Sequence, residues 1–285
     1  MECVTNARLT VSRTESRAVA RLLNLGCGQR FHPAWTNLDV RPTDPSIRSW
    51  DVTQPLPFAD ATFDAVYHSH LLEHLPRADA LPFLQECRRV LKPGGVLRLA
   101  IPNLEAIARL YLLALDDAWF GDKEAAAHHR WLMMELYDQT TREQSGGSML
   151  AHLQEEPCEL AWYRLGMDGA IIRQHLQSFP KAQGSAGGGS LGFLSGLRER
   201  LLRWLLGKEY PLLELGRFRH GGEVHHWMYD RVSLRALLKE AGFERFRCTG
   251  PMESAIPGWT GYHLDTTPEG DICKPDSLFV EADKP

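Results

Sequence analysis

A short apolar run that ends in two closely spaced glycines is the first place where this sequence could bind a ligand. Residues 22–25 read Leu-Leu-Asn-Leu, and Gly26 and Gly28 follow with only Cys27 between them. An apolar run this short and bounded by glycine predicts a strand buried on both faces. Glycine lets the backbone turn sharply and approach a ligand, because no Cβ stands in the way. Gly-x-Gly alone is a weak signal, so the residues that follow it decide its meaning.

Two carboxylates come with the next two short runs. Asp39 falls at the end of residues 35–40, and Asp51 lies at the exit of residues 49–53. A carboxylate at the end of the second strand can accept hydrogen bonds from both hydroxyls of a ribose. Phe31 stands where a dinucleotide fingerprint needs its third glycine, and no Lys-Ser or Lys-Thr pair forms a phosphate loop. We therefore expect a site that is not built around phosphates at a helix N-terminus.

Histidine is the side chain best suited to act as a general base near neutral pH. His70 leaves the fourth predicted strand and His225 precedes a predicted helix, so both are candidate catalytic residues. For His70, shaping a ligand pocket is an equal alternative. For His225 and its neighbour His226, packing and hydrogen bonding at the helix entry is the favoured interpretation.

Zinc-dependent hydrolysis is an alternative, because residues 70–74 also match the His-x-x-Glu-His pattern of inverted zinc peptidases. That chemistry needs the pattern in the middle of a helix, with a third acidic ligand downstream. Here the pattern comes straight off a buried strand, and Pro76 follows two residues later. Zinc hydrolysis by His70, Glu73 and His74 is therefore the less favoured alternative, and we predict no metal site.

The order of these runs predicts the fold. Further strands are expected at 62–67 and 96–101, with an amphipathic helix over 77–92 between them. The last two strands are expected at 243–248 and 277–281. Strands and helices in this rhythm indicate an α/β fold with a doubly wound, mostly parallel, seven-stranded sheet.

Composition limits the partners and the compartment. The chain has 285 residues, of which 44% are hydrophobic and 24% charged, so it can bury a proper core. A formal net charge of -4 argues against nucleic acid as a partner. No apolar run approaches the roughly 18 residues that a membrane span needs. The absence of a signal-peptide pattern, and six scattered cysteines without a Cys-x-x-Cys pair, predict a cytoplasmic protein with reduced thiols.

Together these motifs resemble class I S-adenosylmethionine (SAM)-dependent methyltransferases, in particular the type 11 group. The matching stretches are residues 23–28, 38–40, 56–58 with 63–66, 70–75 and 88–95. The resemblance covers about residues 20–103 and resumes near the C-terminus. There, residues 227–230 and 274–278 resemble a bacterial group of predicted SAM-dependent methyltransferases that is often linked to surface-polysaccharide metabolism.

The resemblance implies a Rossmann-like sheet that binds SAM at the carboxyl ends of its first and fourth strands. Its two glycines would pass beneath the methionine part, and Asp39 would hold the ribose. Asp51 with Val52 would flank the adenine, while Ser69 and His70 would lie near the methyl-bearing sulfur. Two departures affect the amino-acid end of the site: an asparagine replaces the commoner acidic residue of the first strand, and the first crossover helix is missing or vestigial. The expected cofactor-binding residues are Asn24, Gly26, Cys27, Gly28, Asp39, Val40, Asp51, Val52, Ser69 and His70.

The family pattern is lost from residue 104 to about residue 222, which predicts a largely helical insertion between two parts of the methyltransferase domain, 1–103 and 223–285. An insertion after the fifth strand sits over the carboxyl edge of the sheet, so it is the expected lid and acceptor pocket. A Gly/Ser-rich stretch near 183–196 predicts a flexible segment. For the basic amphipathic piece at 197–206, an ordinary surface helix is favoured over peripheral membrane contact.

We therefore expect methyl transfer from SAM to a small-molecule or glycan acceptor, with a sugar or surface-polysaccharide precursor as a candidate. The alternative within the same fold is a protein that binds SAM without transferring its methyl group.

Overall fold

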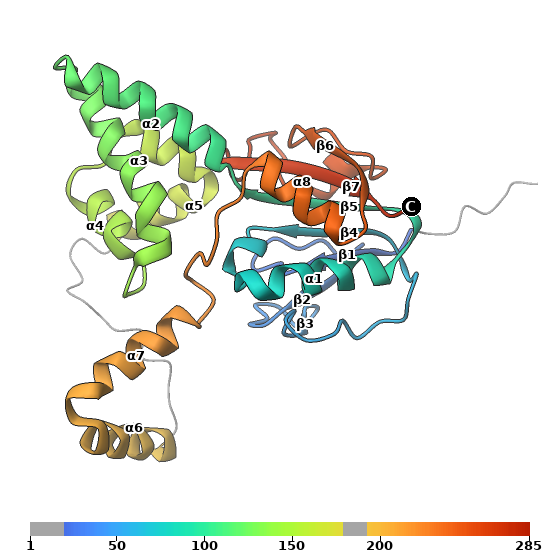
Figure 1. Ribbon diagram of the computed structural model, residues 1–285, viewed down its shortest axis with the longest axis horizontal. Coiled ribbons are helices and arrows are strands. Elements are labelled where there is room, and N and C mark those ends of the chain that lie inside the picture. The colour runs from blue at the N-terminus through green and yellow to red at the C-terminus, as the bar shows by residue number, and fades with distance from the viewer. Residues whose placement is uncertain (1–19, 179–192) are drawn as a thin grey trace, which may run out of the picture.

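A seven-stranded, mostly parallel sheet forms the centre of the computed structural model, which describes residues 20–178 and 193–285 (Figure 1). Neighbouring strands are parallel except that β7 runs antiparallel to both β5 and β6. This arrangement confirms the predicted doubly wound α/β sheet. In spatial order the strands are β3 (Arg48–Ser49), β2 (Thr36–Asp39), β1 (Leu22–Leu25), β4 (Phe63–Ser69), β5 (Leu91–Pro102), β7 (Ser277–Asp283) and β6 (Glu244–Thr249).

Two helices cover one face of the sheet, α1 (Arg77–Val90) and α8 (Arg231–Glu240), and they lie side by side in front of it in Figure 1. Their apolar stripes and the sheet bury a shared core that includes Leu23, Val66 and Leu84. The predicted N-cap of α8 is also observed, because Asp230 accepts hydrogen bonds from the backbone of residues 232 and 233.

An irregular segment packs on the opposite face of the sheet. Its short 3-10 helix η3 (Trp259–Tyr262) brings Trp259 against Trp35 and Tyr67, with ring centroids 6.1 and 5.1 Å apart. The pattern of short strands and turns did not predict this cover. Aromatic rings packed edge to face here bury the apolar surface that a helix covers on the other side.

No helix joins β1 to β2, as the sequence indicated, since residues 26–35 form turns. Two buried amides hold this short parallel crossover. Asn24 Nδ2 donates to Arg30 O at 3.0 Å and to Asn37 Oδ1 at 3.1 Å, and Asn37 Nδ2 donates to Trp35 O at 2.9 Å. The unusual asparagine on the first strand therefore ties the crossover to both strands.

The third strand is shorter and earlier than predicted. It spans Arg48–Ser49 instead of 49–53, at the edge of the sheet. The expected strand stops because Asp51 starts a turn: its Oδ1 accepts hydrogen bonds from Thr53 N at 2.9 Å and from Thr53 Oγ1 at 2.8 Å. A side chain that bonds its own backbone two residues on competes with a strand ladder.

The predicted insertion is built from helices. Its first four, from residue 104 to residue 178, pack together beside the sheet in Figure 1. Trp131 is fully buried among them. The insertion is fastened to the sheet domain at Gly166, which breaks α5 with a φ of 55° and lets Met167 N donate to Cys273 O at 3.0 Å. The helices are α2 (Leu104–Trp119), α3 (Lys123–Thr141), α4 (Gly147–Glu155), α5 (Glu159–Ser178), α6 (Phe193–Leu206), η2 (Gly207–Glu209) and α7 (Tyr210–Arg219).

The Gly/Ser-rich stretch predicted at 183–196 falls mostly outside the described residues. Residues 183–192 are not described, and residues 193–196 correct the prediction because they begin α6. In the described part of the chain, no helix has the length and apolar character that a membrane crossing requires.

One buried charge network holds β5 to the C-terminal segment. Arg98 is fully buried, and its guanidinium lies 2.7 Å from Asp265 Oδ2 and 3.1 Å from Glu281 Oε1. The same guanidinium donates to the carbonyl of Glu253 at 2.8 Å. The irregular segment on the far face of the sheet is thus anchored by one cation.

Replacing Arg98 with Met is expected to lower the free energy of unfolding by about 3–5 kcal/mol, because two buried carboxylates lose their cation. Urea-induced unfolding measures this change. Arg109→Met is the control: Arg109 forms an exposed pair with Glu105, so its loss should cost no more than about 0.5 kcal/mol. Equal effects of the two substitutions would contradict the assignment of Arg98 as the anchor.

Candidate active site

The glycine turn lies at the carboxyl end of β1, an inner strand of the sheet whose four residues are all buried. Gly26 has a φ of +61° and Gly28 a φ of +53°, a backbone region that disfavours any side chain. A Cβ added to Gly26 would lie 2.9 Å from Leu71 Cδ1. Gly28 N donates to Asp39 Oδ2 at 2.8 Å, so the turn is fastened to the end of β2.

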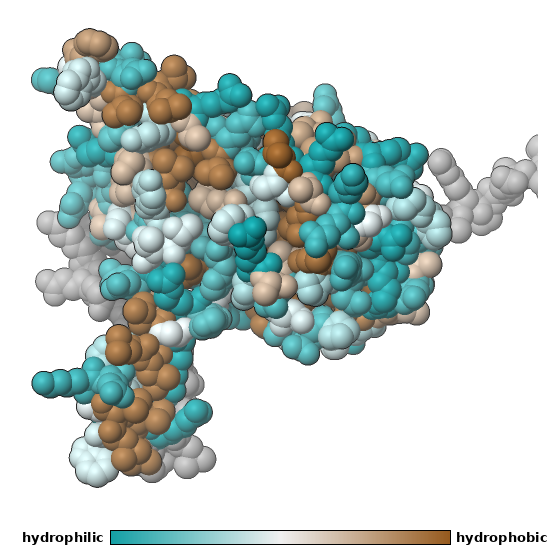
Figure 2. All heavy atoms as spheres, in the orientation of Figure 1, coloured by the Kyte–Doolittle hydropathy of each residue, from teal (hydrophilic) through white to brown (hydrophobic). Residues whose placement is uncertain are grey.

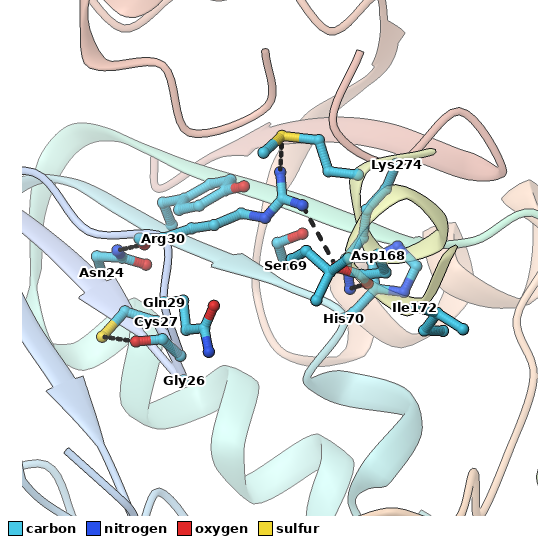
Figure 3. A pocket seen from close by; sticks show the side chains of 14 residues that line it. Asn24, Gly26, Cys27, Gln29, Arg30, Ser69, His70, Asp168, Ile172 and Lys274 are labelled. Carbon is cyan, nitrogen blue, oxygen red and sulfur yellow. Dashed lines mark hydrogen bonds and ion pairs between the residues drawn. The ribbon is translucent and has the colours of Figure 1, made fainter. Parts of the chain in front are cut away.

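Two cavities adjoin this turn. The first, which we call the glycine cavity, has a volume of about 470 Å³ and is drawn in Figure 3. The second, which we call the Asp39 cavity, has a volume of about 640 Å³. Gly26 and His70 line both of them, so the two cavities meet at these residues.

The structure brings all ten residues of the predicted cofactor-binding set to these walls. In the glycine cavity they are Asn24, Gly26, Cys27, Gly28, Ser69 and His70, and in the Asp39 cavity they are Gly26, Asp39, Val40, Asp51, Val52 and His70. Their contacts with a ligand stay a prediction. Burial raises the pKa of the Cys27 thiol to about 12, so this thiol is not a nucleophile at neutral pH.

His70 is held in an unusual conformation directly after β4. Its φ of +48° is uncommon for a residue with a side chain and costs of the order of 1–3 kcal/mol. Its backbone N donates to Ala100 O at 2.9 Å. The ring is fixed at both nitrogens, with Nε2 2.7 Å from Ser277 Oγ and Nδ1 3.2 Å from Glu73 Oε1. The surrounding structure therefore stabilises one orientation of this imidazole at the junction of the cavities.

Glu73 is the carboxylate behind His70. It lies in the 3-10 helix η1 (Leu72–His74) and is fully buried. Burial on its own would raise the pKa of Glu73, but the His70 ring, whose Nδ1 lies 3.2 Å from Oε1, lowers that pKa below its ordinary value. Burial also lowers the pKa of His74, and it lowers the pKa of His225 to about 3. At neutral pH an ionised carboxylate therefore faces neutral imidazoles of His74 and His225.

The two histidines after the insertion occupy different places. His225 is buried and its ring packs edge to face on His74, with centroids 4.7 Å apart, so its side chain lies behind the wall of the Asp39 cavity. His226 lines that cavity, and its backbone N donates to Glu73 O at 2.7 Å. A catalytic role for His225 stays a prediction. The histidine that lines the Asp39 cavity is its neighbour, His226.

One group of three side chains could hold a metal ion, among the residues that the structure describes. The potential ligand atoms of Glu73, His74 and His225 lie within 4.8 Å of one another. The zinc-peptidase pattern would use His70 in place of His225, but the His70 ring faces Glu73 and Ser277. Catalytic zinc keeps one position open to substrate, whereas two of these three groups are buried. The arrangement therefore favours a histidine–carboxylate cluster over a zinc hydrolase.

Sequence reasoning missed three charged residues that line the glycine cavity. Arg30 and Lys274 lie 3.5 and 3.4 Å from the two carboxylate oxygens of Asp168, which comes from helix α5 of the insertion (Figure 3). Lys274 lies in residues 274–278, a stretch that carries part of the family resemblance. That resemblance was the one feature of the sequence that could have indicated a role for Lys274. Arg30 and Asp168 are far apart in sequence, so no local pattern could pair them.

Comparison with known proteins agrees with this geometry. Residues 30–99 match a family model described as a methyltransferase domain. A protein of Mycolicibacterium smegmatis described as a probable SAM-dependent methyltransferase is 46% identical over 48 residues, which is 17% of this chain and 18% of that protein. A probable methyltransferase of Aspergillus luteorubrus, ltbC, is 38% identical over 72 residues, 25% of each protein. The chain thus spans a quarter or less of the length of these relatives.

A crystal structure of a SAM-dependent methyltransferase from Methanosarcina mazei aligns with 93% of this chain and 92% of its own, at 15% identity and a TM-score of 0.35. Residues 30–99 thus match a methyltransferase domain, and the sheet order and the glycine turn with its carboxylate are the arrangement that the resemblance to class I, Rossmann-like, SAM-dependent methyltransferases predicts. SAM is the cofactor of this class.

Asp39→Asn is expected to weaken SAM binding roughly 10–100-fold, because hydrogen bonds to a charged group are worth about 1.5–3 kcal/mol. Calorimetric titration with SAM measures the affinity. Asp44→Asn is the matched control, since Asp44 is a partly exposed aspartate of the following loop that bonds Ser46 and does not line the Asp39 cavity. Unchanged affinity in Asp39→Asn would remove the ribose role of this carboxylate.

Proposed function

We propose that this protein transfers the methyl group of SAM to a hydroxyl-bearing acceptor, and that a sugar or surface-polysaccharide precursor is the acceptor class. The observation that carries the proposal is the meeting of two cavities at Gly26 and His70. Methyl transfer requires a donor site and an acceptor site that share one point, because donor and acceptor must be held in line. Holding them so contributes up to about 7–11 kcal/mol in the best cases.

The residues present fit the cofactor. Asp39, Asp51 and Val52 line the cavity that would hold the adenosine, and the glycine turn would lie against the methionine part. Gly28 supports this fit, because an added Cβ would meet no protein atom within 4 Å and would take up open space beside the turn. Bound SAM supplies a methyl group that is already electrophilic on its sulfonium.

The main chemical task left to the protein is then to remove the proton from the acceptor hydroxyl. The Glu73 carboxylate, 3.2 Å from His70 Nδ1, favours the neutral tautomer that carries its ring proton on Nδ1, because a carboxylate can only accept. In that tautomer Nε2 keeps its lone pair and accepts the hydroxyl proton of Ser277. An acceptor hydroxyl in the glycine cavity can give its proton to Nε2 directly or through the Ser277 hydroxyl. Glu73 and Ser277 act in this scheme as positioning residues.

The acceptor side of the glycine cavity is formed by the insertion. Asp168 from α5 lies between Arg30 and Lys274, and Ile171 with Ile172 adds apolar surface next to these charges. Alternating donors, acceptors and apolar patches suit a polyhydroxylated ring, which offers many hydroxyls and C–H faces. This lining supports a sugar over a purely apolar acceptor.

Incubation with methyl-labelled SAM and a metabolite extract is expected to give a labelled product, which mass spectrometry identifies. His70→Asn should slow this transfer roughly 10²–10⁴-fold, because a general base is lost, while SAM affinity stays within about threefold. Asparagine is chosen because it tolerates the left-handed backbone of His70. His129→Asn on α3 is the matched control and should transfer methyl at the wild-type rate.

Two results would contradict methyl transfer, and a third would contradict only the general-base role of His70. SAM binding without any labelled product indicates a binding protein. Bound zinc without SAM affinity indicates a hydrolase. Full activity in His70→Asn would show that His70 is not the general base. The labelled product would then be the remaining evidence for methyl transfer.

A further inference from the structure

A helical hairpin projects from the body of the protein, formed by α6, η2 and α7 (Figure 1). The main packing partners of α6 are η2 and α7. Tyr210 is buried between the two helices and donates its hydroxyl to Glu199 Oε2 at 2.9 Å, and Arg217 Nη1 lies 2.8 Å from the same oxygen. The inner faces of the hairpin are therefore held together by specific contacts, which leaves the outer face of α6 toward solvent.

That outer face is apolar. Leu201, Trp204 and Leu205 are exposed, with Trp204 at 78% of its full surface. Their spacing of three and four residues places them on one stripe of the helix. Leu212 on α7 is exposed as well, and Figure 2 shows hydrophobic atoms gathered in a band along this hairpin. Single exposed apolar residues are ordinary, but a continuous band marks a surface that binds something.

The charges around the band are basic. Residues 198–219 carry six basic and three acidic side chains, a net charge of +3, whereas the whole chain carries -4. At 100° per residue, Arg198 and Arg200 flank the apolar stripe of α6 on opposite sides. A tryptophan and leucine stripe with arginine on both flanks is typical of helices that lie in the interface of an anionic membrane.

The tip of α2 shows that apolar exposure alone does not define this surface. Trp119 and Phe120 are exposed at 83% and 86%, more than any residue of the hairpin stripe. Their charged neighbours in sequence are Asp116, Asp117, Asp122 and Lys123, so acidic side chains outnumber basic ones there. Acidic side chains around an apolar patch repel anionic lipid. The basic surroundings of Trp204 therefore allow contact with an anionic membrane, whereas the acidic surroundings of Trp119 oppose it.

We propose that the outer face of the α6–α7 hairpin docks on an anionic lipid surface. Leu201, Trp204 and Leu205 enter the boundary between headgroups and acyl chains, and Arg198 and Arg200 lie against lipid phosphates. The hairpin continues into residues 220–222, which line the Asp39 cavity, and Arg41 Nη2 donates to Gly221 O at 3.1 Å. Docking would therefore bring the site close to the membrane surface. The inference does not depend on the chemistry proposed for that site.

Co-sedimentation of the full chain with lipid vesicles tests the proposal. Binding is expected to vesicles of phosphatidylcholine with phosphatidylglycerol, to weaken with salt, and to be much lower with phosphatidylcholine alone. Trp204→Ser should reduce the partition coefficient about tenfold, because the most exposed residue of the stripe no longer enters the interface. Arg198→Gln with Arg200→Gln should remove the preference for phosphatidylglycerol.

Trp119→Ser is the matched control and should bind vesicles like the wild type. Both tryptophans are exposed, so neither change should disturb folding, which circular dichroism checks. The proposal is overturned if the wild type does not sediment with anionic vesicles at low salt, or if Trp204→Ser binds as well as the wild type. It is also overturned if sedimentation analysis shows a dimer that Trp204→Ser abolishes while vesicle binding is absent, because the stripe then covers a second copy.

Discussion

The hydrogen bond between the Gly28 amide and the Asp39 carboxylate, 2.8 Å long, fixes the centre of this molecule. It joins the left-handed turn after β1 to the end of β2, and parallel neighbours place both ends at one edge of the sheet. Because the crossover between these strands has no helix, the buried amides of Asn24 and Asn37 must hold the loop that carries the glycines. The wall of both cavities is therefore held to β1 and β2 by side-chain hydrogen bonds.

A second constraint links this wall to the insertion. The carbonyl of Glu73 accepts a hydrogen bond from the His226 amide, and the His225 amide donates to Gln139 O on α3 at 2.9 Å. The side chain of the same glutamate holds the His70 ring. Helix α5 reaches the site from the same insertion, through Asp168 between Arg30 and Lys274. The insertion thus contacts the backbone next to the Glu73–His70 pair through Gln139, and it lines the glycine cavity through Asp168.

Much of this could be predicted from local sequence. The buried run at residues 22–25 and the carboxylate at position 39 belong to neighbouring strands, so their meeting follows from topology alone. The bounds of the third strand could not be predicted, because the Asp51 side chain competes with the backbone ladder at a sheet edge. Asp168 and Ser277 were missed for another reason, since their partners lie more than a hundred positions away in the chain. Contacts of that kind depend on packing and leave no periodic pattern.

A crystal structure with S-adenosylhomocysteine would locate the cofactor site without requiring the acceptor. We expect the ribose hydroxyls to bind Asp39, the adenine to lie beside Val52, and the amino-acid tail to pass the glycine turn toward Ser69. A ligand bound elsewhere, with the space beside Gly26 and Asp39 left to solvent, would contradict this expectation.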